Sequence, residues 1–133
     1  MSQRSQRKEE HLALAKMFFN SNKDNDFNHV HLIRPALPES AVNKDSISTE
    51  MFGHKISAPF FINAMTGGSD TSYIINQRLA KAAAAENIPM ALGSASILEK
   101  EIDQIKSFEV ARQENPDGLI FANVNPTTDP KVA

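Results

Sequence analysis

Three short runs of apolar residues follow one another along the second half of the chain. They are residues 59–62, 89–92 and 118–121, and each begins about thirty residues after the one before it, which is the length of one β-strand with its crossover helix. The pattern therefore predicts three parallel strands joined by right-handed helical connections.

The two segments between these runs have apolar residues at helical spacing. The first carries Ile75, Leu79, Ala82 and Ala83 after the candidate caps Asp70, Thr71 and Ser72. This helix should end near residues 86–87, before Pro89. The second carries Leu98, Ile102, Ile105 and Phe108. It predicts one helix that ends at the turn-forming residues 115–118.

Each apolar run leads into small, polar or glycine residues at its carboxyl end. These segments are residues 63–68, 93–96 and 122–126. The loops that follow parallel strands converge at one end of the sheet, where α/β proteins bind ligands. A single polar loop can be an ordinary turn, but three in register favour a shared ligand face.

The first 57 residues do not follow this repeat. Residues 4–19 predict a helix with apolar and basic positions, and residues 20–28 predict a polar loop. Residues 27–33 fit a short extended or helical piece, and residues 48–56 predict a hairpin centred on Gly53 and His54. We therefore divide the chain into an N-terminal helix and hairpin extension, residues 1–57, and a βα repeat region, residues 58–133.

The length of the chain conflicts with a closed barrel. The chain has 133 residues, whereas a complete (β/α)8 barrel needs roughly 250. Three βα units can form a small open sheet or the front portion of a larger protein. Because the sequence ends where a third helix would begin, we expect the second alternative, a truncated fragment.

Composition narrows the possible function classes. The sequence has 14 Lys and Arg residues against 16 Asp and Glu residues, which argues against non-specific nucleic-acid binding. It has no cysteine, so thiolate chemistry and Cys-ligated metals are excluded. No apolar run is long enough to span a membrane, and the charged N-terminus lacks a signal-peptide core. We therefore expect a cytoplasmic protein without nucleic-acid or membrane partners.

Four motifs follow one another along the chain: Arg7-Lys8-x-x-His11-Leu12, Arg34-x-Ala36-Leu37-Pro38-Glu39, Ala58-Pro59-Phe60-Phe61-Ile62-Asn63-Ala64-Met65-Thr66-Gly67-Gly68 and Met90-Ala91-Leu92-Gly93-Ser94. With them the chain resembles type 2 isopentenyl-diphosphate Δ-isomerase, a flavoenzyme built on a (β/α) barrel. The resemblance covers essentially all of the sequence. It implies an α/β fold that is the N-terminal part of a (β/α)8 TIM barrel, about three βα units preceded by an N-terminal helix and short hairpin.

The resemblance implies FMN as the cofactor, held at the three strand ends by Ala64, Met65, Thr66, Gly67, Ser94 and Asn123. The turn at residues 65–68 offers backbone amides with little side-chain bulk, as a flat flavin ring requires. The Ser94 hydroxyl can hydrogen-bond the flavin rim, and the Asn123 amide can donate and accept together. Ordinary turn and helix-cap roles are the alternatives for these residues.

Arg7, Lys8 and His11 share one face of a helix, if residues 4–19 are helical. Arginine can bind a diphosphate through two parallel hydrogen bonds, and lysine acts as a point charge. The resemblance implies substrate contacts from these three residues and from Ser94 and Ser96. Many family members carry Arg where this chain has Ser96, which weakens the expected contact there. A solvated helix face, partly neutralised by the glutamates between the cations, is the alternative.

The implied reaction interconverts isopentenyl and dimethylallyl diphosphate in isoprenoid biosynthesis, with reduced FMN, Mg²⁺, and NADPH as the reductant. The family's catalytic and metal-binding residues lie beyond residue 133, so we expect no catalytic residue and no metal ligand within this chain, and no activity from it alone. Exposed strand edges predict a homo-oligomer. The alternatives are another FMN-dependent TIM-barrel enzyme, a 2-hydroxy-acid oxidase or an IMP dehydrogenase-like enzyme, and a non-catalytic assembly fragment.

Overall fold

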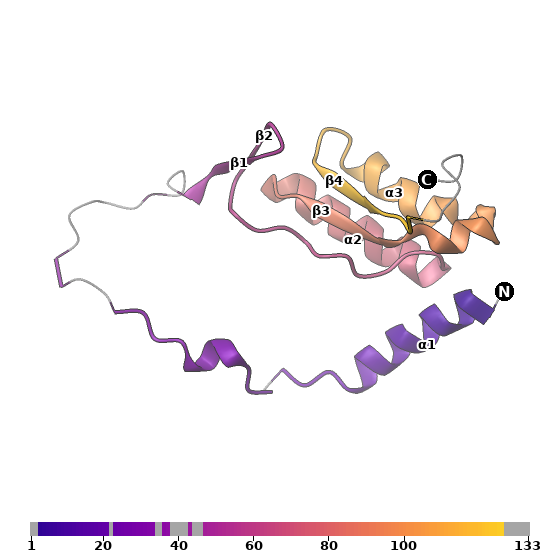
Figure 1. The fold of residues 1–133 in the computed structure, drawn as a ribbon, viewed down its shortest axis with the longest axis horizontal. Coiled ribbons are helices and arrows are strands. Elements are labelled where there is room, and N and C mark those ends of the chain that lie inside the picture. The colour runs from indigo at the N-terminus through magenta and orange to yellow at the C-terminus, as the bar shows by residue number, and fades with distance from the viewer. Residues whose placement is uncertain (1–2, 22, 34–35, 38–42, 44–46, 127–133) are drawn as a thin grey trace.

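The structure is a computed structural model that describes residues 3–21, 23–33, 36–37, 43 and 47–126. Arg34 and the expected start of a third helix, after residue 126, lie outside the described residues. In chain order the elements are α1 (Gln3–Met17), η1 (Asp26–His29), β1 (Thr49–Met51), β2 (His54–Ile56), α2 (Asp70–Glu86), β3 (Met90–Ser94), η3 (Ala95–Glu99), η4 (Ile102–Ile105), α3 (Lys106–Glu114) and β4 (Ile120–Asn123) (Figure 1).

The expected parallel strands lie side by side in their sequence order. Strands β3 and β4 pair in parallel, with Met90 opposite Ile120. The first expected strand is reduced to one bridge, in which the Ile62 amide donates to the Pro89 carbonyl at 2.9 Å. The prediction of a full first strand over residues 59–62 was wrong, and the reason is local. Pro59 has no amide proton, and the Phe60 amide bonds back to the Ala58 carbonyl.

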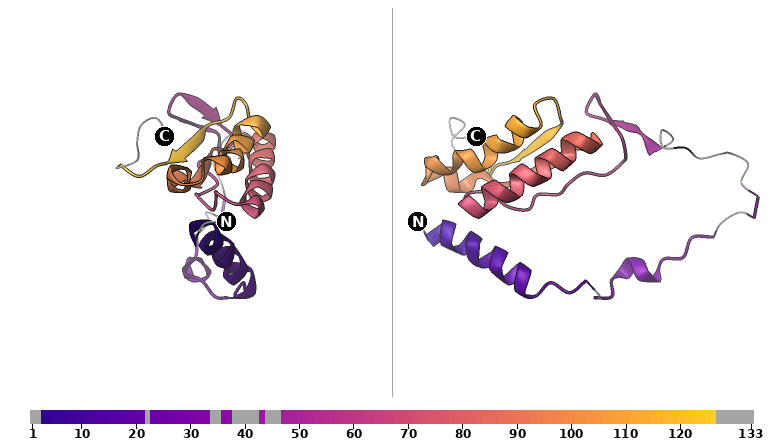
Figure 2. Two further views of the ribbon diagram at one scale, coloured as in Figure 1. Left: turned by 90° about the vertical axis from the view of Figure 1, so that its right-hand side faces the viewer. Right: turned by 180° about the vertical axis from the view of Figure 1, so that it is seen from behind.

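Helices α2 and α3 both pack on one face of this small sheet (Figure 2). Their contact is built from small side chains, and Ala80, Ala83 and Ala111 are each 0 % exposed. These alanines close on Met90 of β3, which is 1 % exposed. The described core therefore lies between the sheet and these two helices, the arrangement expected of βα units.

The opposite side of the sheet carries aromatic rings, and no helix of the described residues covers them. Phe61 and Phe121 meet edge to face at 6.0 Å between ring centroids, and Phe52 from the hairpin meets Phe121 at 5.8 Å. We call Phe52, Phe61 and Phe121 the aromatic face. Phe61 is 44 % exposed and Phe52 is 80 % exposed, so apolar surface remains open to solvent on this side.

The second connection is not the single helix that its apolar spacing predicts. It divides into η3, η4 and α3. Glu101, with φ −133° and ψ 76°, interrupts the helical backbone between the first two of these segments. The reason lies in packing, because Ile97 and Leu98 are buried with Phe108 while Ile102 is 56 % exposed. The apolar positions therefore come from three short segments and not from one continuous stripe.

The other local predictions fare better. The hairpin is confirmed, with antiparallel β1 and β2 joined through Phe52 and Gly53 at φ 50° and 78°, the paired positive values of a type I′ turn. Helix α2 ends where expected, at Asn87 in the left-handed region. Its N-cap is Ser69, one residue before the candidates chosen from the sequence. Helix α1 ends at Met17, and η1 occupies part of the segment predicted to be a loop.

Candidate functional site

The three strand ends that the sequence singled out lie next to one another. Ser94, at the end of β3, is opposite Asn123, at the end of β4. On the other side of β3, the Gly93 amide donates to the Thr66 carbonyl at 3.2 Å. The carboxyl ends of the parallel strands therefore form one continuous edge.

Glycine is required at this edge because two backbones touch there. A Cβ atom added to Gly93 would lie 2.6 Å from the carbonyl carbon of Thr66, closer than any side chain can approach a peptide. Gly68 has φ 87°, and a Cβ there would lie 2.6 Å from the Ile97 side chain. The turn formed by Thr66, Gly67 and Gly68, which we call the glycine turn, is thus packed against β3 and η3 without room for side chains.

A layer of buried hydroxyl and amide groups lies beneath the glycine turn. The Thr66 hydroxyl hydrogen-bonds Ser72 at 2.8 Å, and the Gly68 amide donates to the Ser107 hydroxyl at 2.8 Å. Asn76, on α2, donates its side-chain amide to the Thr66 carbonyl at 3.2 Å. Sequence reasoning named Ser72 only as a candidate helix cap, and it missed Asn76 and Ser107. The signal for Asn76 was a polar residue on the same stripe of α2 as Ala80 and Ala83.

Helix α1 docks onto the same edge through its first turns. The Lys8 ammonium group donates to the carbonyls of Gly67 and of Ser94, the latter at 3.1 Å. It also lies 5.8 Å from the centre of the Phe108 ring, within cation–π range. Ser5 is 1 % exposed, and its hydroxyl lies 3.3 Å from the Gly68 carbonyl. The sequence had no signal for Ser5, because its partner is 63 residues away.

Two cavities open between α1 and the strand ends. The first, which we call the cation cavity, has a volume of about 250 Å³ and is lined by Arg7, Lys8, His11, Ser94, Ser96 and Ile97. The second, the turn cavity, has a volume of about 360 Å³ and is lined by Lys8, His11, Leu12, Ala15, Met65, Thr66, Ile75, Gly93 and Ser94. They share Lys8, His11 and Ser94, so a ligand in one can contact residues of the other.

The structure thus brings together most residues that the sequence proposed for ligand binding. All five substrate candidates line the cation cavity. Met65, Thr66 and Ser94 line the turn cavity, whereas Ala64, Gly67 and Asn123 do not line it. Met65 is 69 % exposed and Thr66 is 8 % exposed, so the Thr66 backbone is better placed than its side chain to meet a ligand. Ser94 also caps η3, with its hydroxyl accepting from the Ser96 amide.

The chemistry of this edge suits an anionic ligand with a flat apolar part. Arg7, Lys8 and His11 gather cationic groups and N–H donors on one wall, where oxygen-rich anions are bound. Thr66 and Gly93 line the turn cavity beside these cations, and because Gly93 has no side chain a flat ring can approach the backbone there. The residues present therefore fit a flavin beside a phosphorylated ligand. Within the described ranges no group of three or more His, Cys, Asp or Glu side chains is placed to hold a metal ion.

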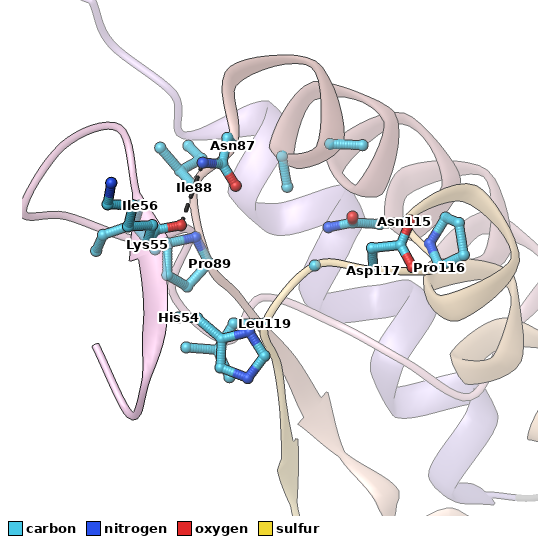
Figure 3. A pocket seen from close by; sticks show the side chains of 13 residues that line it. His54, Lys55, Ile56, Asn87, Ile88, Pro89, Asn115, Pro116, Asp117 and Leu119 are labelled. Atoms are coloured by element: carbon cyan, nitrogen blue, oxygen red, sulfur yellow. Dashed lines mark hydrogen bonds between the residues drawn. The ribbon is translucent and has the colours of Figure 1, made fainter. Parts of the chain in front are cut away.

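A further cavity lies at the opposite ends of the strands (Figure 3). We call it the amino-end cavity; its lining includes His54, Lys55, Asn87, Asn115 and Asp117, and its volume is about 260 Å³. The Asn87 side-chain amide donates to the Lys55 carbonyl at 3.2 Å across its rim (Figure 3). This bond ties α2 to the hairpin, and the cavity lies at the other end of the strands, so we do not assign it to the same ligand.

Among the described residues no helix is long and apolar enough to cross a membrane.

Comparison with known proteins gives a family and a set of relatives. The family model for FMN-dependent dehydrogenases matches residues 13–124.

Curated relatives share the sequence over nearly its whole length. An isopentenyl-diphosphate delta-isomerase from Limosilactobacillus reuteri is 41 % identical over 126 residues, which are 93 % of this chain and 36 % of the relative. A second, from Latilactobacillus sakei, is 40 % identical over 129 residues, 97 % of this chain and 37 % of the relative. A third, from Listeria monocytogenes, is 38 % identical over 123 residues, 92 % of this chain and 34 % of the relative. The chain thus spans little more than a third of the length of the relatives it matches.

Proposed function

Because the chain belongs to the family of FMN-dependent dehydrogenases, we propose that it supplies the FMN-binding turn and the substrate-binding helix of an isopentenyl-diphosphate Δ-isomerase. One observation carries the proposal. Arg7, Lys8 and His11 of α1 meet Ser94 and Ser96 in the cation cavity, directly beside the glycine turn. The names of the relatives point to the same substrate.

In this proposal FMN lies against the carboxyl edge of the strands. Ala64, Met65, Thr66 and Gly67 hold it from the first strand end, Ser94 from the second and Asn123 from the third. Reduced FMN supplies the acid and base chemistry that moves the double bond by one carbon. The protein side chains bind, orient and exclude water, and Gly93, which lines the turn cavity without a side chain, lets a ring approach the backbone there.

The diphosphate occupies the cation cavity. Arg7 is exposed, while Lys8 is held between the Gly67 and Ser94 carbonyls. In this proposal Lys8 acts on the diphosphate as a point charge, and Arg7 binds it through two parallel hydrogen bonds. Ser96, at a position where the resemblance implies Arg in many family members, offers only a hydroxyl.

The fold proposed for the whole protein is a (β/α)8 barrel, of which this chain forms about three βα units after an extension of residues 1–57. Parallel strands in sequential order, with α2 and α3 packed on one face of them, support it. The phosphate-binding loops of such barrels follow the late strands. We therefore expect the 133-residue chain alone to bind FMN weakly and to show no turnover.

Further parts of the proposal rest on the resemblance. Mg²⁺ would be held by residues outside this chain, and NADPH would serve as the reductant. A cytoplasmic location stays a prediction.

Self-association is proposed through the aromatic face, where Phe61 and Phe52 are open to solvent. The substitution Phe61→Ser should shift the size-exclusion profile toward monomer. An unchanged profile would contradict self-association through this face.

Activity is tested in a fused protein, in which the full 133-residue chain is joined to the part of the L. reuteri relative that follows the matched region. We expect reduced FMN, Mg²⁺ and isopentenyl diphosphate to give dimethylallyl diphosphate. A rival FMN barrel enzyme would oxidise a 2-hydroxy acid or turn over IMP instead, and either result without isomerisation overturns the proposal. If the chain is instead a non-catalytic assembly fragment, it should form a defined oligomer without bound flavin colour, and the fused protein should be inactive.

A further inference from the structure

The glycine turn is held from beneath by a side chain that a ligand above it would not touch. Asn76 lies on the inner face of α2 and is 1 % exposed. Its amide nitrogen donates one hydrogen to the Thr66 carbonyl at 3.2 Å and the other to the Ser107 carbonyl at 2.8 Å. Both of its N–H groups are therefore used, and they tie the turn to α3 through α2.

These bonds set the orientation of two successive peptide planes. The carbonyl and the following N–H of a trans peptide point in opposite directions. Because the Thr66 carbonyl points inward to Asn76, the Gly67 N–H points away from Asn76. The next peptide is reversed, since the Gly68 N–H donates inward to the Ser107 hydroxyl at 2.8 Å and the Gly67 carbonyl meets Lys8 of α1.

A buried amide is not what stability alone would select at this position. Its neighbours on the same stripe of α2 are Ala80 and Ala83, both 0 % exposed. An apolar side chain of similar volume packs in such an interface without the cost of removing an amide from water. Helix α2 has another polar link to α3, since the Gln77 amide donates to Glu114 at 2.7 Å, and this link does not touch the turn.

We propose that Asn76, supported by Ser107, is a positioning residue for the FMN-binding turn. It holds the Thr66 carbonyl inward and so fixes the orientation of the Thr66 backbone, which lines the turn cavity where the flavin would lie. This inference rests on the proposed function, because it assigns a role within the same site. Neither Asn76 nor Ser107 lines the turn cavity or the cation cavity, so both act through the backbone of the turn.

The test compares Asn76→Leu and Ser107→Ala with the matched control Gln77→Leu in the fused protein. FMN affinity is measured by quenching of flavin fluorescence, and stability by thermal unfolding without FMN. We expect Asn76→Leu to weaken FMN binding roughly ten-fold, the scale of losing a hydrogen bond that orients a buried group. Ser107→Ala should weaken it in the same direction and shift the flavin absorption bands. Gln77→Leu should change the melting temperature and leave the FMN dissociation constant unchanged.

Each outcome decides the matter. If the unmutated fused protein binds FMN and Asn76→Leu binds it equally well, the positioning role is overturned while the proposed function stands. If Gln77→Leu weakens FMN binding as much as Asn76→Leu, the effect is general destabilisation and the positioning role is again overturned. If the unmutated fused protein binds no FMN, both proposals fail. If Asn76→Leu does not fold, Ser107→Ala decides, because it removes the acceptor for Gly68 and, besides it, only the bond that the hydroxyl donates to the Gln104 carbonyl.

Discussion

Cavities of similar size lie at the two ends of the parallel strands, and their chemistry differs. The amino-end cavity is bordered by a turn that is held from within its own segment, because the Arg112 guanidinium donates to the carbonyls of Asn115, Pro116 and Gly118. At the carboxyl end, the cations come from α1 and reach across to another part of the chain. The contacts at the amino ends of the strands therefore stabilise one turn, whereas those at the carboxyl ends bring together residues that are distant in the sequence.

The difference shows why cavity volume alone does not identify a functional site. Arginine at the amino end is used to hold a turn, so its charge is directed at backbone carbonyls. Lys8 also meets backbone carbonyls, but Arg7 and His11 beside it line the same cavity. Convergence of several N–H donors from one helix, next to a turn without side chains, is the feature that distinguishes the carboxyl end.

The largest contrast should come from adding one methyl group at each end. In Gly93→Ala the new Cβ meets the Thr66 backbone at 2.6 Å, whereas in Gly118→Ala it meets the Asn115 side chain at 2.1 Å. A side chain can rotate away and a backbone cannot. We expect Gly93→Ala to lower the free energy of unfolding by about 3 kcal/mol and Gly118→Ala by about 1 kcal/mol, measured by urea denaturation. Equal losses would contradict the close backbone contact.

Removing one lysine charge at each end should separate substrate binding from general surface charge. Lys8→Met removes an ammonium group in the cation cavity, and Lys55→Met removes one at the amino-end cavity. In the fused protein we expect Lys8→Met to raise KM for isopentenyl diphosphate on the order of thirty-fold, the scale of a charge-assisted hydrogen bond. Lys55→Met should leave KM unchanged. A comparable rise in both variants would mean that long-range charge, and not a contact, governs binding.

The arginine at the amino end should matter for stability and not for ligand binding. Arg112→Met removes the donor for three backbone carbonyls of the turn before β4. We expect a loss of about 1.5 kcal/mol in unfolding free energy, since these carbonyls then turn to water. The FMN dissociation constant of the fused protein should not change. A weaker FMN complex would show that the two ends of the strands are coupled.

The smallest effect is expected from an exposed carboxylate at the amino-end cavity. Asp117 lines this cavity and is exposed to solvent. Asp117→Asn keeps the shape and removes the charge, so unfolding free energy should change by less than about 0.5 kcal/mol. Isomerase activity of the fused protein should be unaffected. A clear loss of activity would indicate that the amino-end cavity takes part in function after all.

The sequence predicted the parts of the fold that depend on local pattern. The hairpin at Gly53, the end of α2 at Asn87 and the parallel order of the strand segments follow from turn chemistry and spacing within a short window. The single helix after β3 was wrong, because the burial of Ile97 and Leu98 against Phe108 overrides the spacing of their neighbours. The position of an apolar residue in the sequence does not reveal which surface of the fold its side chain packs against.

For the candidate site, too, some features follow from the sequence and others only from the tertiary structure. Sequence alone determined which residue types stand at the strand ends and in the first helix, because motif and spacing are properties of the chain itself. Only the tertiary structure decided that Lys8 spans partners 59 and 86 residues away, and that Asn76 joins Thr66 to Ser107 across 10 and 31 residues. Such contacts exist only once the helices have packed, because a hydrogen bond in a buried layer depends on the partner that folding brings to it.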